Sequence, residues 1–120
     1  MSLYHDLILD HYRNPRNHGG LTKATHQGDA KNPTCGDSIH MDILVENDTI
    51  VNVGFTGAGC AISQASASLL TESVKGKSVK EALALVPGDV LKLLGVALSP
   101  NRLKCGLLSL ETLKQALINK

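Results

Sequence analysis

The chain of 120 residues is predicted to fold as one α+β domain, residues 1–120, in which a small antiparallel sheet carries several helices on one face. Two observations predict this class. Apolar and polar residues alternate over residues 38–46 and 50–55, which is the pattern of paired strands. Before and after these strands, apolar residues recur every three to four positions, which is the pattern of amphipathic helices.

The segment before the strands is expected to be a helix followed by a loop. Apolar residues recur at helical spacing from Leu3 to Tyr12, which predicts a helix over residues 2–13. The helix should end before Pro15, because the residue that precedes a proline avoids helical backbone angles. Residues 14–34 are rich in Gly, Asn, His and Pro, and we expect an irregular loop there.

The two strands should form a hairpin around the turn signal Asn47-Asp48. After the second strand, the sequence TGAGC at residues 56–60 predicts a glycine corner. The residues expected to face the core are Ile39, Met41, Ile43 and Val45 in the first strand, and Val51, Val53 and Phe55 in the second.

The first two helices after the hairpin have recognisable ends. One should follow the glycine corner and end near Gly76. Ser78 and Glu81 have the spacing of a capping box, so a second helix is expected from Ser78 to about Val86. Pro87 with the following glycine should stop it.

Two more helices should complete the chain. Asp89 is expected to cap a short helix that reaches about Val96. Residues 98–101, with the sequence LSPN, then break the pattern. From Leu103 to Leu117, leucines at helical spacing predict a final amphipathic helix.

Composition argues against several kinds of partner. Twelve basic and eleven acidic residues give a net charge of +1, so neither nucleic acid nor an anionic membrane is expected as the main partner. Two Tyr, one Phe and no Trp leave no platform on which bases could stack. No apolar run reaches the roughly 18 residues that span a bilayer. Charged residues interrupt the N-terminal apolar pattern, unlike a signal peptide, so a cytoplasmic protein is expected.

The three cysteines, Cys35, Cys60 and Cys105, stand at the expected junctions between elements. Three thiols cannot all pair, and their wide spacing is no disulfide framework. Free cysteines are often only small buried apolar residues, but such residues usually lie within an element. Cys60 and Cys105 are expected to open helices, where unpaired N–H groups and the helix dipole stabilise a thiolate. We therefore interpret the three as chemically functional thiols.

Asp37 is the candidate for a fourth ligand. It lies two residues from Cys35, and in an extended segment two such side chains point the same way. If the three thiolates converge, Asp37 would complete a tetrahedral site for a metal such as zinc. A carboxylate oxygen is a harder ligand than a thiolate, so it would be the exchangeable one. Capping of a turn is the usual role of a loop aspartate and stays open.

The histidines offer no base for a cysteine-dependent enzyme, because none is adjacent to Cys60 or Cys105 in the sequence. Such an enzyme remains an alternative without a placed base. The five histidines are His5, His11, His18, His26 and His40. Most of them are expected to be solvated.

Four segments together resemble the U-type iron–sulfur cluster assembly proteins, the family of SufU, IscU and the N-terminal domain of NifU. They are LILDHYRNPRNHG at 7–19, NPTCGD at 32–37, GAGCAISQASAS at 57–68 and RLKC at 102–105. The resemblance covers nearly the whole chain, in order. It implies a fold of the SufE/NifU type, with a three-stranded antiparallel sheet.

The resemblance also implies a site and its cargo. Cys35, Asp37, Cys60 and Cys105 would hold zinc in a resting form, or iron and a 2Fe–2S cluster during assembly. Sulfur would arrive as persulfide from a cysteine desulfurase, and downstream iron–sulfur proteins would accept the cluster. Such a chain would be a non-enzymatic scaffold, or else a sulfurtransferase-type acceptor of sulfur.

The residues near the last cysteine resemble the SufU branch of this family in some respects and differ from both branches in others. Lys104 and Arg102 resemble SufU, whereas the IscU branch has a histidine directly before the cysteine. The long insertion usual in SufU is missing, and LSPNR at 98–102 replaces the chaperone-binding LPPVK of IscU. The persulfide acceptor would be Cys35 on a SufU-like route and Cys105 on an IscU-like route. Lys104 and Arg102 would support the thiolate, or be plain surface charges.

Two alternative functions stay open beside the scaffold. One is a zinc-dependent sulfurtransferase partner of the desulfurase that builds no cluster. The other is a structural zinc module, against which the absence of closely spaced CxxC pairs counts.

Overall fold

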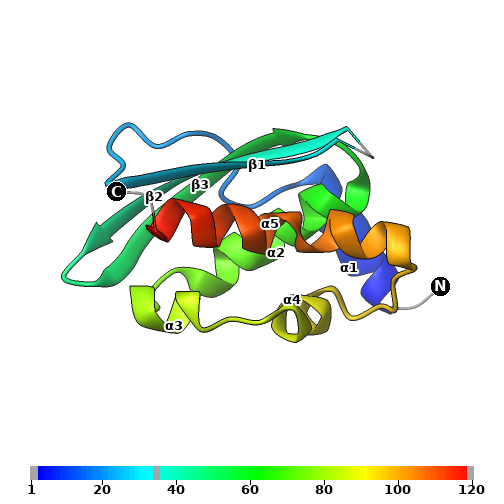
Figure 1. Ribbon diagram of the computed structural model, residues 1–120. Coiled ribbons are helices and arrows are strands. Elements are labelled where there is room, and N and C mark those ends of the chain that lie inside the picture. Colours follow the sequence, from blue (N-terminus) through cyan, green and yellow to red (C-terminus); the bar gives the residue numbers. More distant parts are fainter. Residues whose placement is uncertain (1–2, 34–35, 119–120) are drawn as a thin grey trace.

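The computed structural model describes residues 3–33 and 36–118, and it confirms the α+β class. Within these residues, three antiparallel strands form one sheet in the order β1-β2-β3, with helices against one of its faces (Figure 1). No helix in the described ranges is both long and apolar enough to cross a membrane. The elements are α1 (Leu3–Arg13), β1 (His26–Asn32), β2 (Asp37–Glu46), β3 (Thr49–Ala58), α2 (Ala61–Val74), α3 (Val79–Leu83), α4 (Pro87–Leu94) and α5 (Pro100–Ile118).

The core lies between the inner face of the sheet and the helices. Ile39, Met41 and Ile43 on the central strand β2 are at most 1% exposed, which confirms the inner face predicted from alternation. Val53 and Phe55 on β3 continue the same apolar layer. Each large apolar side chain that is fully buried contributes about 1.5–3 kcal/mol. The fold therefore has its own source of stability, independent of any metal.

The predicted loop over residues 14–34 is wrong in its second half, where β1 pairs with β2. The inward residues of β1 are Gly28, Ala30 and Asn32, so the strand carries no large apolar alternation. A Cβ at Gly28 would lie 2.6 Å from the backbone nitrogen of Ala116 in α5. Because α5 packs directly on the backbone of β1, only small residues fit there, and the usual strand signal is lost.

The edge strand β3 is longer than predicted at both ends and differs in one inward side chain. Val51, expected to face the core, is 47% exposed, whereas Ile50 is fully buried. The pairing register shifts where Val45 of β2 meets Ile50. A bulge at this point reverses the alternation, which the periodic pattern alone does not reveal.

Pro87 begins a helix instead of ending one. The capping box that starts at Ser78 is confirmed, but α3 ends at Leu83. Pro87 lies in the first turn of α4, where its missing N–H leaves no helical bond unmade. Asp89 is not the N-cap of that helix, which is Val86, and the helix ends at Leu94 instead of about Val96. Its carboxylate accepts a hydrogen bond from the backbone N–H of Val86 at 2.9 Å, from within the first turn.

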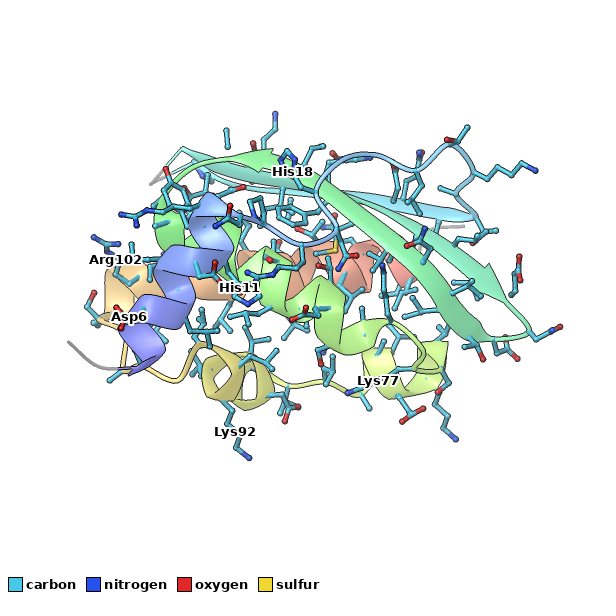
Figure 2. All side chains as sticks on the ribbon, turned by 180° about the vertical axis from the view of Figure 1, so that it is seen from behind. Asp6, His11, His18, Lys77, Lys92 and Arg102 are labelled. Atoms are coloured by element: carbon cyan, nitrogen blue, oxygen red, sulfur yellow. The ribbon has the colours of Figure 1, made fainter. Side chains whose placement is uncertain are left out.

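Most of the five histidines were expected to be solvated; two of them, His11 and His40, are held in hydrogen bonds, and His11 is buried while His40 is half-buried. His11 on α1 is 3% exposed, and its Nδ1 lies 2.7 Å from Oγ of Ser68 on α2. Figure 2 shows His11 beside α2. Burial lowers the pKa of His11. The same Ser68 oxygen accepts a hydrogen bond from the backbone N–H of Arg16 at 2.8 Å. The first helix and the following loop are thus bound to α2.

His40 lies on the outer face of the sheet between two carboxylates. Its Nδ1 is 2.8 Å from Asp29 on β1, and its Nε2 is 2.8 Å from Asp42 on β2. Asp42 also accepts a hydrogen bond from the backbone N–H of Leu21 at 3.0 Å. Burial alone would lower the pKa of His40, but the hydrogen bonds to Asp29 and Asp42 raise it above the ordinary value of 6.5. This cluster ties β1 and the loop before it to β2.

Asp29→Asn should weaken the fold in a pH-dependent way. A pKa raised in the folded state contributes stability below the unfolded pKa of 6.5 and loses it as pH rises through the folded-state pKa. At about pH 5.5 the parent should exceed the variant by about 0.5 kcal/mol in free energy of unfolding, as for a partly exposed ion pair. Urea unfolding over a pH series measures the difference. A difference that grows as pH rises would contradict this account of His40.

Candidate metal centre

Asp37, Cys60 and Cys105 come from three elements and meet at one end of the sheet. Asp37 begins β2, Cys60 is the N-cap of α2, and Cys105 lies on α5. One possible ligand atom from each residue can be chosen so that all three lie within 4.8 Å of one another. Asp37 and Cys105 are each 2% exposed, and Cys60 is half-buried. The structure thus assembles two thiols and one carboxylate in a largely enclosed place.

This donor set fits a zinc ion. Tetrahedral zinc holds thiolate sulfur at about 2.3 Å and carboxylate oxygen at about 2.0–2.2 Å, so its ligand atoms lie about 3.5–3.8 Å apart. Separations within 4.8 Å need to close only slightly to reach that geometry. Cys35, the remaining predicted ligand, lies outside the described residues. It precedes Asp37 by two positions in the sequence.

Asp37 is held in place by the N-terminus of α2. Its Oδ1 accepts a hydrogen bond from the backbone N–H of Cys60 at 3.0 Å, and its Oδ2 lies 3.9 Å from the Cys60 sulfur. The first N–H groups of a helix have no partner within it and favour a nearby negative charge. One carboxylate oxygen is therefore bound by the helix end, while the other faces the thiol. Asp37 combines a capping role with a position among the candidate ligands.

Gly59 makes this approach possible. The predicted glycine corner is confined to this residue, since Gly57 and Ala58 still belong to β3. Gly59 has φ of 140°, which residues with side chains rarely adopt. A Cβ at this position would also overlap Oδ1 of Asp37. Only glycine lets the strand turn into α2 while the carboxylate lies against the turn.

Cys105 does not open the last helix, contrary to prediction. The helix α5 begins at Pro100, so Cys105 lies in its second turn. Its N–H falls beyond the unpaired groups of the first turn, and the helix-end argument therefore does not apply to Cys105. Cys105 reaches the site because α5 packs against α2 and β2.

The two cations near Cys105 are exposed and line different grooves. Lys104 lines a groove between β1 and α5, together with Lys31 and Glu111. Arg102 lines another groove beside α1 and the start of α2, and Figure 2 shows it at the end of α5 nearest α1. Their predicted support of a thiolate stays a prediction.

The thiol and carboxylate cluster, at the end of a three-stranded sheet covered by helices, defines a candidate metal-binding α+β domain. The chain belongs to the NifU-like N-terminal domain family, whose model matches residues 3–119, and this confirms the family indicated by the four sequence segments.

Relatives in both branches are similar over most of their length. The chain is 37% identical to the zinc-dependent sulfurtransferase SufU of Bacillus subtilis, across 95% of this chain and 88% of that protein. It is 44% identical to the iron–sulfur cluster assembly scaffold protein IscU of Aquifex aeolicus, across 95% of this chain and 73% of that protein. The structure of the SUF-system protein FiSufU of Fervidobacterium islandicum AW-1 superposes with a TM-score of 0.82 at 32% identity, covering 98% of this chain and 96% of that one.

Gly59→Ala should displace Asp37 and weaken metal binding. The new methyl group overlaps the carboxylate, so zinc affinity should fall by at least about tenfold, as when a group that orients ligands is lost. Competition with a chromophoric chelator measures this affinity. Gly76→Ala is the matched control, because Gly76 has φ of 87° but nothing within 4 Å of an added Cβ. The control should lose about 1 kcal/mol of stability and keep its zinc affinity. Equal zinc affinities in the two variants would refute the steric role of Gly59.

Proposed function

We propose that this chain accepts persulfide sulfur from a cysteine desulfurase and assembles or relays a 2Fe–2S cluster on Cys35, Asp37, Cys60 and Cys105. The observation that carries the proposal is the convergence of Asp37, Cys60 and Cys105 within 4.8 Å. The sequence supplies a third thiol, Cys35, two positions before Asp37. Relatives named as IscU scaffolds support the same function.

The sulfur transfer needs only a thiolate of this chain. The thiolate attacks the outer sulfur of the desulfurase persulfide, a new S–S bond forms, and the old S–S bond breaks to release the desulfurase thiolate. Cys105 is 2% exposed, which disfavours it as the first acceptor in this conformation. We therefore favour Cys35. Lys104 and Arg102 are proposed to support the attacking thiolate electrostatically.

The mixed ligand set suits a site that releases its cargo. Thiolates bind iron and zinc strongly, whereas the carboxylate of Asp37 is the harder and more exchangeable ligand. If Asp37 were displaced from a bound metal, its carboxylate would still have the Cys60 N–H as a partner. Zinc would be the resting occupant, and iron with sulfide the cargo. A reducing compartment such as the cytoplasm would keep the thiols free for this work.

The second candidate function is zinc-dependent sulfur transfer without cluster assembly. The name of the Bacillus subtilis relative favours it, and so do Lys104 and Arg102, which resemble SufU. The same four residues would then hold zinc while one thiol takes the sulfur.

An anaerobic incubation separates these functions. The zinc-loaded chain is mixed with its desulfurase, cysteine, ferrous iron and a dithiol that reduces persulfide sulfur to sulfide. We expect the visible absorbance of a 2Fe–2S cluster to grow on the parent and to be lost in Cys60→Ser. A protein mass increased by one sulfur atom, with zinc retained and no cluster absorbance, would favour the sulfurtransferase instead. If neither cluster nor persulfide forms, the proposed function is wrong.

A further inference from the structure

A buried hydroxyl joins α2 to α5 directly beside Cys105. Oγ of Ser66 donates a hydrogen bond to the backbone carbonyl of Gly106 at 2.6 Å and lies 2.8 Å from Oγ of Ser109. Both serines are at most 1% exposed. A serine has one hydroxyl hydrogen, so Ser109 must donate to Ser66 in this pair. The bond between the helices therefore depends on Ser66, and Ser109 supports it.

The helix α2 binds one candidate ligand at its N-cap and the neighbour of another farther along. At its start, the N–H of Cys60 holds Asp37. Six residues later, at a rise of 1.5 Å per residue, Ser66 lies about 9 Å along the axis and bonds the residue after Cys105. Over this distance of about 9 Å, the helix α2 acts as a rigid rod. The bond at Ser66 therefore fixes where Cys105 lies relative to Cys60.

Gly106 leaves room for α4 and the segment after it to pack closely against α5. A Cβ on Gly106 would lie 2.8 Å from the side chain of Leu98 and 3.3 Å from that of Leu94. A glycine inside a helix costs about 1 kcal/mol relative to alanine, so its presence within α5 favours close packing over helix propensity. Apolar contacts of this kind are not directional. A hydrogen bond is directional, because it weakens steeply when its angle changes.

We propose that Ser66 is a positioning residue for the metal centre. Its hydrogen bond to Gly106 fixes the rotation and the axial position of α5 against α2, and so the separation of the Cys60 and Cys105 sulfur atoms. The inference rests on one part of the proposed function, namely that these two thiolates bind the same metal ion. It requires neither sulfur transfer nor cluster assembly.

The chain offers a matched control in α5. Oγ1 of Thr112 donates to the backbone carbonyl of Leu108 at 2.8 Å, and the side chain is fully buried. This bond has the chemistry and burial of the Ser66 bond, but it stays within α5. Thr112→Val removes the hydroxyl while keeping the shape of the side chain.

The test compares metal binding of the parent, Ser66→Ala, Ser109→Ala and Thr112→Val. Zinc affinity is measured by competition with a chromophoric chelator, and Co²⁺ is used as a spectroscopic substitute that reports thiolate ligation and geometry. We expect Ser66→Ala to bind zinc at least about tenfold more weakly and to change the Co²⁺ spectrum. Ser109→Ala should have a smaller effect. Thr112→Val should match the parent in both measurements.

Several outcomes would overturn the inference. The positioning role is refuted if Ser66→Ala binds zinc as tightly as the parent. It is also refuted if Ser66→Ala loses no more zinc affinity than Thr112→Val does. If Ser66→Ala does not fold, the double variant Ser66→Ala/Ser109→Ala replaces both hydroxyls by apolar groups and should restore folding. Parent-like metal binding in that variant would also refute the role. A parent that binds neither ion would refute the shared metal centre and this inference with it. A parent that binds zinc but builds no cluster would refute only cluster assembly.

Discussion

The hydrogen bond from the backbone N–H of Cys60 to the carboxylate of Asp37 connects the start of the central strand to the N-terminus of α2, and the candidate metal centre depends on it. Among the described residues, the buried carboxylate of Asp37 would otherwise have only the long 3.9 Å contact with the Cys60 thiol to compensate for its lost hydration. Gly59 allows the approach because it has no side chain. The helix end thus stabilises the carboxylate that we propose as the exchangeable ligand.

The rest of the fold keeps these groups in place. The inner face of the sheet and the helices share an apolar core, so the ligands are positioned by packing as well as by any metal. Ser66 connects α2 to α5 beside Cys105, and the Asp29–His40–Asp42 cluster binds the edge strand β1 to β2 on the opposite face. We therefore expect the chain to stay folded when the proposed cargo leaves the site.

The sequence predicted those parts of the molecule that have a periodic or local signal. The alternation in β2, the capping box at Ser78 and the family segments around the cysteines all gave such signals. The strand β1 gave none, because Gly28 and its inward neighbours are small where α5 packs against them. The inward prediction for Val51 failed because a bulge reverses the pattern. Ser66 gave no signal either, since a serine within a helix does not reveal a partner forty residues away.

The most direct test of the account is to remove zinc with a chelator and follow the metal-free chain by amide-resolved NMR with hydrogen exchange. The account predicts a folded, well-dispersed spectrum in which the Cys60 amide exchanges slowly, because its N–H remains bonded to Asp37. The chain should then bind zinc again. A chain that unfolds on chelation and refolds only with zinc would contradict the account, and would identify a structural zinc module instead.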